Sequence, residues 1–88
     1  MEKKVEVQVK VYGTLKGACG VECKTLLVPI DCTEAFAYVL EWFQMNSGLD
    51  ASKVLLLYND VSAIKKTHMG QMVKSGDVFK LLPLISGG

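Results

Sequence analysis

The stretch TEAFAYVLEWFQMNSG, residues 33–48, decides the fold class of this chain. It predicts one amphipathic helix, because its large apolar side chains recur at helical spacing and form a stripe that can face a core. The stripe consists of Phe36, Val39, Leu40 and Phe43. Asp31 or Thr33 offers an N-cap, and Asn46 and Gly48 supply the stop.

A second set of large side chains lies on the adjoining flank of the same helix: Tyr38, Trp42 and Met45. Such a set usually forms the shoulder of the core stripe and less often a surface for a partner. The sequence leaves both interpretations open.

Two strands are predicted before the helix. VEVQVKVY, residues 5–12, alternates apolar and polar side chains, which is typical of a half-buried strand with its valines on a core. GTLKGACG, residues 13–20, holds three glycines and predicts a turn or loop. VECKTLLVPI, residues 21–30, predicts a second strand, and the short connection favours an antiparallel hairpin.

Strands are predicted again after the helix. VLLLY, residues 54–58, is short and apolar, so we expect a strand buried on both faces or nearly so. Residues 61–76 show no firm period and predict only a very short strand and loops. DVFKLLPL, residues 77–84, predicts a last strand with Phe79 and Leu81 on one face.

The order of these elements indicates the fold class. Strand-rich ends around a single helix predict an α+β domain, in which a mixed four- to five-stranded sheet packs on the main helix. The helix crossover between the hairpin and the third strand would let the first and last strands lie side by side in the centre of the sheet.

Size and composition indicate one globular domain. The chain has 88 residues, 50% of them hydrophobic, which suffices for one modest core. A formal net charge of +1 argues against nucleic acid as a partner, since phosphate binding requires a concentrated positive face. No apolar run approaches the roughly 20 residues of a membrane helix, and the first residues do not resemble a signal peptide.

Three cysteines, an odd number without a secretory segment, indicate a reducing, cytoplasmic compartment. Cys19, Cys23, Cys32 and His68 lack the paired spacing of structural zinc sites, so we expect no metal. We expect the thiols to be small buried or half-buried side chains, and His68 to lie on the surface or in a loop. No paired acid and base, phosphate loop or activated nucleophile is visible, so we expect a protein that is not an enzyme.

Two segments resemble a known family. VKVYGTLK, residues 9–16, is similar to the opening strand and turn of molybdopterin-synthase small subunits, and MVKSGDVFKLLPLISGG, residues 72–88, is similar to their closing segment. The chain thus resembles the MoaD/ThiS-type sulfur carriers, which are ubiquitin-like proteins. The resemblance implies a β-grasp domain over residues 1–84 and a flexible Gly-Gly tail over residues 85–88.

The resemblance also implies a function. A ubiquitin-activating-enzyme-like adenylyltransferase would use ATP to adenylate the carboxylate of Gly88, with Gly87 preceding it in the channel, and a persulfide would then convert Gly88 to a thiocarboxylate. The sulfur would pass to the large subunit of molybdopterin synthase or to another acceptor, and no cofactor would stay bound to the chain. Partner contacts are expected at Lys74, Leu82, Leu84 and Ile85.

Other functions use the same features. A ubiquitin-like modifier would be joined through Gly88 to lysines of other proteins, and a carrier for tRNA thiolation or thiamine synthesis would need the same activated terminus. A plain β-grasp interaction module would not use Gly88 at all. Deletion of Gly87 and Gly88 separates these classes, because only the interaction module would keep its activity.

Overall fold

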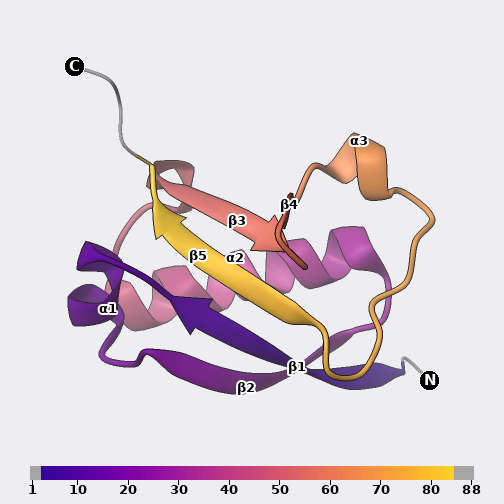
Figure 1. Cartoon of the computed structure of the whole chain (residues 1–88), viewed down its shortest axis with the longest axis horizontal. Helices are drawn as coiled ribbons and strands as arrows, with labels where there is room; N and C mark the ends of the chain where they lie inside the picture. Colours follow the sequence, from indigo (N-terminus) through magenta and orange to yellow (C-terminus); the bar gives the residue numbers. More distant parts are fainter. Residues whose placement is uncertain (1–2, 85–88) are drawn as a thin grey trace.

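The computed structural model describes residues 3–84 of the chain. Its elements follow one another along the sequence as Figure 1 shows. They are β1 (Lys4–Val11), α1 (Thr14–Cys19), β2 (Cys23–Pro29), α2 (Cys32–Ser47), the short 3-10 helix η1 (Ala51–Lys53), β3 (Val54–Tyr58), β4 (Val61–Ser62), α3 (Lys65–His68) and β5 (Val78–Pro83). No helix within residues 3–84 is long and apolar enough to cross a membrane.

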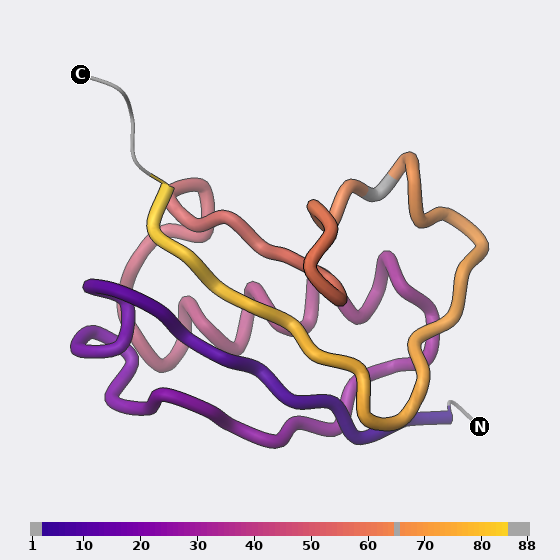
Figure 2. The backbone as a smooth tube through the Cα atoms, in the orientation of Figure 1, coloured from indigo at the N-terminus to yellow at the C-terminus, as the bar shows by residue number. Residues whose placement is uncertain are grey.

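The five strands form one mixed sheet in the order β2-β1-β5-β3-β4. β1 and β5 pair in parallel at the centre, while β2, β3 and β4 join antiparallel. The predicted hairpin, the α+β class and the central position of the terminal strands are therefore confirmed. α2 crosses one face of the sheet and leaves the other face open, as Figures 1 and 2 show. We call this second face the open face.

The core lies between α2 and the covered face of the sheet. Alternate residues of β1 point into it, so the period-two pattern of valines is confirmed. The residues that are at most 2% exposed there include Val7, Val9, Val11, Phe36, Val39, Phe43, Phe79 and Leu81.

Both ends of α2 are capped through its flanking residues. The Asp31 carboxylate accepts a hydrogen bond from the backbone N–H of Glu34 at 3.1 Å and one from the Thr33 hydroxyl at 2.6 Å, so Asp31 is the N-cap. The hydrogen bond from Thr33, together with that from Glu34, lowers the pKa of Asp31 below its ordinary value. Gly48 ends the helix at φ 73°, as the sequence predicted.

The prediction of a loop over residues 13–20 is wrong, because Thr14–Cys19 forms the short helix α1. Two of the three glycines lie at the ends of this helix, with Gly13 at φ 62° and Gly20 at φ 80°. Leu15 is 4% exposed and anchors the helix to the core. These two glycines therefore mark the ends of a helix and do not prevent it from forming.

The expectation that β3 is buried on both faces is also wrong. Leu56 and Tyr58 face the core, whereas Leu55 is 37% exposed. The reason is that α2 covers one face only, so alternate residues of β3 lie on the open face. In the following segment β4 is the short strand that was predicted, while the single turn of α3 was not predicted.

Candidate functional site

The candidate site is the end of the central strand β5, where the chain leaves the sheet (Figures 1 and 2). Because β1 and β5 are parallel, the end of β5 lies at the same edge of the sheet as the end of β1 and helix α1. The predicted site residues Ile85, Gly87 and Gly88 lie outside the described residues. The described part of the site is the root of this segment, formed by Leu82, Pro83 and Leu84.

Neighbouring segments hold this root on two sides. The backbone N–H of Tyr12, just after β1, donates to the carbonyl of Leu81 at 3.0 Å. The backbone N–H of Leu84 donates to the carbonyl of Lys53 in η1 at 3.1 Å. The last described residues are thus tied both to the first strand and to the turn before the third.

The turn after β1 also packs against the root. A Cβ atom on Gly13 would lie 3.2 Å from Cγ of Pro83, which is closer than side-chain carbons normally approach. Gly13 has φ 62° and ψ −141°, a conformation that only glycine adopts readily. The one signal for Gly13 in the sequence was its position in segment 9–16, which resembles the carrier family. The spacing of residues gave no indication of its contact with Pro83.

The structure brings two of the predicted partner-contact residues together. Leu82 lies on the open face directly opposite Leu55 of β3, and Leu84 follows two residues later. Leu82 is half-buried, Leu55 is 37% exposed and Leu84 is 54% exposed. We call Leu55, Leu82 and Leu84 the open-face patch. Apolar side chains gathered beside a strand end are suited to docking against another protein.

Lysines adjoin the open-face patch. Lys10 of β1 and Lys80 of β5 are register partners on the open face. The Lys80 ammonium donates to the Asp60 carboxylate, and this hydrogen bond raises the pKa of Lys80 above its ordinary value. The patch and its lysines together would suit a partner surface that is apolar at its centre and acidic at its margin.

Lys74, the remaining predicted contact, lies elsewhere. It belongs to the turn before β5, where the backbone N–H of Gly76 donates to the carbonyl of Glu6 at 2.9 Å, near the start of β1. The root of the tail lies beside the end of β1 instead. Lys74 is therefore at the opposite end of the sheet from Leu82 and Leu84, as the course of β5 in Figure 1 shows.

An aspartate in that turn has a structural role that the sequence did not reveal. The Asp77 carboxylate accepts hydrogen bonds from the Tyr58 hydroxyl and, at 2.8 Å, from the backbone N–H of Lys74. Burial opposes the charged form of Asp77, but these hydrogen bonds outweigh it and lower the pKa of the carboxyl. Burial, and then the contact with Asp77, raises the pKa of Tyr58. Ser, Gly and Asp at residues 75–77 favour a turn at this position, but they give no indication of the contact with Tyr58.

The expectation that His68 lies on the surface or in a loop is wrong, since it is the last residue of α3 and is 6% exposed. Its Nδ1 lies 3.0 Å from the carbonyl of Ile64, and its ring packs edge-on against Phe36 and Tyr58. α3 carries it over the aromatic end of the core. The pattern of the sequence held no signal for this placement.

The three cysteines lie in different surroundings. Cys32 is buried, Cys19 is half-buried and Cys23 is exposed, and burial raises the pKa of Cys32 and of Cys19. Within residues 3–84, whose side chains are described apart from that of Lys65, no group of three or more His, Cys, Asp or Glu is placed to hold a metal ion.

Comparison with known proteins identifies the fold. No protein-family model and no curated protein sequence matches the chain. Among solved structures, the HVO 2177 protein of Haloferax volcanii has 18% identity and a TM-score of 0.71, with 97% of this chain and 88% of that chain covered. Small archaeal modifier protein 1 of Methanosarcina acetivorans has 17% identity and a TM-score of 0.67, with 98% and 99% covered.

A third solved structure is a putative molybdopterin converting factor, subunit 1, from Pyrococcus furiosus. It has 17% identity and a TM-score of 0.63, with 92% of this chain and 99% of that chain covered. At identities this low, the structural likeness establishes the fold alone, which is the ubiquitin-like β-grasp. The fold implied by the resemblance to MoaD/ThiS-type carriers is therefore confirmed.

Proposed function

We propose that this chain is a ubiquitin-like sulfur carrier that works through the carboxylate of Gly88. The observation that carries the proposal is a β-grasp fold whose central strand β5 leads, from a root held at Gly13 and Lys53, into a segment that ends in Gly87 and Gly88. The fold supplies the body for recognition, and the glycines supply the group that reacts.

The proposed chemistry has three steps. The Gly88 carboxylate attacks the α-phosphorus of ATP in the active site of an adenylyltransferase, and pyrophosphate leaves. The terminal sulfur of a persulfide on a donor protein then attacks the acyl carbon and AMP leaves. A thiol cleaves the remaining S–S bond, taking the donor sulfur into a disulfide and releasing the thiocarboxylate. ATP belongs to the partner, and the chain holds no permanent cofactor.

Glycine suits the reacting end for a steric reason. Activation takes place in a site that excludes water, and side chains on Gly87 or Gly88 would widen the segment that has to enter it. The four residues from Ile85 to Gly88 can extend by roughly 13 Å at about 3.3 Å per residue. That length suffices to enter a pocket while the open-face patch stays on the surface of the partner.

The open-face patch is the proposed docking surface for the activating partner. Leu82 and Leu84 adjoin the segment that enters the active site, and Lys10 and Lys80 lie on the same face of the sheet. Apolar contact would provide affinity, and the lysines would orient an acidic partner surface. Ile85 would continue the apolar contact. Lys74, at the other end of the sheet, would serve only a partner that extends along the whole domain.

The proposed acceptor is the large subunit of molybdopterin synthase, and the proposed compartment is the cytoplasm. The fold shared with the Pyrococcus furiosus protein, which is named as a putative molybdopterin converting factor subunit, supports this choice. A second candidate function is protein modification, in which a lysine amine attacks the acyl carbon of adenylated Gly88, forms an isopeptide bond and releases AMP. The fold shared with small archaeal modifier protein 1 favours it.

Intact mass spectrometry tests the proposal. The chain is incubated with a candidate adenylyltransferase, ATP and a persulfide donor, beside a variant that lacks Gly87 and Gly88. We expect a mass increase equal to the exchange of one oxygen for one sulfur in the full chain only. No increase with several such enzymes would contradict carrier function. Isopeptide adducts on other proteins, without a thiocarboxylate, would favour the modifier.

A further inference from the structure

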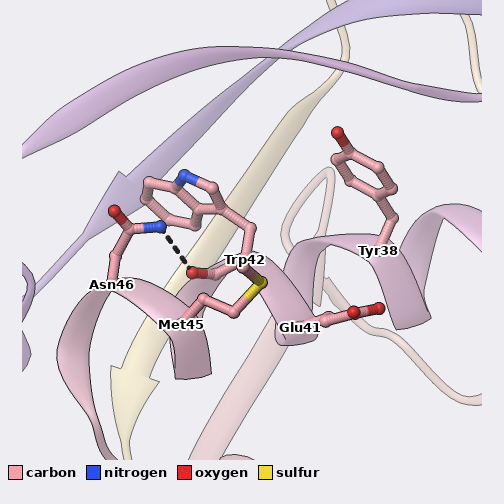
Figure 3. Close-up of a pocket in the computed structure, with 5 residues that line it drawn as sticks. All are labelled: Tyr38, Glu41, Trp42, Met45 and Asn46. Carbon is pink, nitrogen blue, oxygen red and sulfur yellow. Dashed lines mark hydrogen bonds between the residues drawn. The ribbon is translucent and has the colours of Figure 1, made fainter.

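The solvent-facing flank of α2 holds a hollow of about 260 Å³. Its lining residues are Tyr38, Glu41, Trp42, Met45 and Asn46, all from α2 (Figure 3). α2 covers the face of the sheet opposite the open face, so this hollow is separate from the surface proposed above to dock the activating partner.

The walls of the hollow are aromatic and apolar. Tyr38, Trp42 and Met45 follow one another at one-turn spacing along the helix, with the Tyr38 and Trp42 rings standing on successive turns, as Figure 3 shows. Trp42 is half-buried, but Tyr38 is 40% and Met45 78% exposed. The core-shoulder interpretation therefore accounts for Trp42 and not for the two more exposed side chains.

The side of Trp42 nearer the end of the helix is held in place. The Asn46 amide donates a hydrogen bond to the carbonyl of Trp42 at 2.8 Å, so this side chain is fixed beneath the indole (Figure 3). A site with one wall already ordered loses less entropy when a ligand binds.

The charges favour a cation. Glu41 lies three residues after Tyr38 and next to Trp42 in α2, and its exposed side chain ends below Tyr38, pointing away from the indole, in Figure 3. The faces of both rings are electron-rich and attract positive charge. One cation of the chain already uses this attraction, because the Lys4 ammonium of β1 lies 6.0 Å from the centre of the Tyr38 ring.

We propose that this hollow binds an arginine side chain presented by a partner protein. The guanidinium stacks on the Trp42 indole, and the exposed Glu41 side chain turns toward it to accept its hydrogen bonds, while the alkyl stem lies against the Met45 thioether. Arginine fits better than lysine because its planar group can stack and donate two hydrogen bonds at once, and because it is less strongly hydrated than an ammonium.

This site goes beyond the proposed carrier function and does not depend on it. Since the hollow and the open-face patch lie on opposite sides of the domain, a partner with an arginine could stay bound while Gly88 is activated. The test below uses neither the tail nor the activating enzyme, so its failure is distinguishable from failure of the proposed function.

Titration of the full chain with short peptides tests the proposal. The probes are acetyl-Gly-Ala-Arg-Ala-Gly-amide and the same peptide with citrulline or lysine in place of arginine, where citrulline keeps the shape of arginine without its charge. Trp42 is the single tryptophan of the chain, so its fluorescence reports on the hollow directly. Backbone amide chemical shifts then map the binding site. We expect saturable binding of the arginine peptide with shifts at residues 38–46.

Two variants should change the affinity in opposite directions. Glu41→Gln removes the carboxylate and should weaken arginine binding by about three- to tenfold. Lys4→Met removes the competing cation and should tighten it by about twofold. Glu6→Gln changes the net charge as Glu41→Gln does, but on the open face, and should leave the affinity unchanged. A general loss of structure would not produce effects of opposite sign.

Several outcomes would overturn the proposal. Equal affinity for the citrulline peptide would mean an apolar hollow without cation selectivity. Equal affinity for the lysine peptide would remove the assignment to arginine. Shifts that map away from residues 38–46, or a fluorescence change that never saturates, would mean that the hollow is not a binding site.

Discussion

Gly13 and Pro83 pack so closely that a Cβ atom on Gly13 would lie 3.2 Å from Cγ of the proline. The two residues are far apart in sequence, and the parallel pairing of β1 with β5 brings them together. The turn after the first strand thereby supports the root of the segment that carries Gly88. The first and last segments of the chain thus meet at the candidate site.

The Gly13–Pro83 contact predicts which glycine substitutions lower the free energy of unfolding most. Gly13→Ala should lower the free energy of unfolding by about 1–3 kcal/mol, because it combines an unfavourable backbone conformation with the contact to Pro83. Gly20 also has a positive φ, of 80°, but a Cβ there would lie in open space. Gly20→Ala should therefore lower the free energy of unfolding by less than Gly13→Ala does. Urea denaturation followed by circular dichroism measures both.

Gly17→Ala is the matched control for these two variants. Gly17 lies inside α1, and a Cβ there would meet no atom within 4 Å. Alanine should therefore raise the free energy of unfolding by about 0.5–1 kcal/mol. Equal losses at Gly13 and Gly20 would show that Pro83 contributes nothing to the requirement for glycine.

The hydrogen bond between Tyr58 and Asp77 predicts a pH-dependent loss of stability. Tyr58→Phe should lower the free energy of unfolding by about 1–2 kcal/mol at neutral pH, since a partly buried carboxylate loses a donor. The folded-state pKa of Asp77 is lowered, so its contribution is present above the unfolded pKa of about 3.9 and is lost as the pH falls through the lower folded value. The difference between wild type and variant should shrink below about pH 4 in thermal melts. A difference that is constant down to the lowest pH would argue against the Asp77 carboxylate as the acceptor.

The same tyrosine predicts a second effect at alkaline pH. The pKa of Tyr58 is raised in the folded state, so its contribution is present below the unfolded pKa of about 10 and is lost as the pH rises toward the folded value. Above about pH 10, the melting temperature of the wild-type chain should fall more steeply with pH than that of Tyr58→Phe. Melting temperatures measured across that range, on both proteins in the same buffers, provide the comparison. Parallel slopes would mean that Tyr58 titrates normally in the fold.

The open-face patch predicts a loss of activation without a loss of folding. Leu55→Glu and Leu84→Glu each place a carboxylate on an exposed part of the patch, so they should change the free energy of unfolding by less than about 0.5 kcal/mol. Formation of the Gly88 thiocarboxylate should fall by about tenfold or more, because a charge would be buried in the contact with the partner. Mass spectrometry of timed samples measures the rate.

Leu27→Glu is the control for the patch. Leu27 of β2 is 56% exposed and pairs with Glu6 of β1, so it lies two strands away from β5 and near the other end of the sheet. This variant should form the thiocarboxylate at the wild-type rate. If all three variants were slowed alike, net charge and not a docking surface would explain the effect.

Local patterns in the sequence predicted the regular elements because burial repeats with the period of each element. The valines of β1 alternate into the core and the apolar stripe of α2 faces it, so both elements lie within a few residues of their predicted bounds. α1 was missed because Leu15 is its one deeply buried residue, which leaves no period to detect. The exposure of Leu55 in β3 was missed because an apolar strand has the same sequence pattern whether one face or both faces are covered.

The sequence by itself determined the α+β class and the order of strands around one helix, and its likeness to a carrier family led to the proposal that Gly88 is the reacting group. Only the tertiary structure decided that Gly13 supports Pro83, that Asp77 binds Tyr58, and that Lys74 lies far from Leu82. The physical reason is that periodicity records which side of an element is buried, whereas these relationships depend on the register of strands that are distant in sequence. In this chain the parallel pairing of β1 with β5 brings Gly13 to Pro83, and the antiparallel pairing of β3 with β5 brings Tyr58 to Asp77.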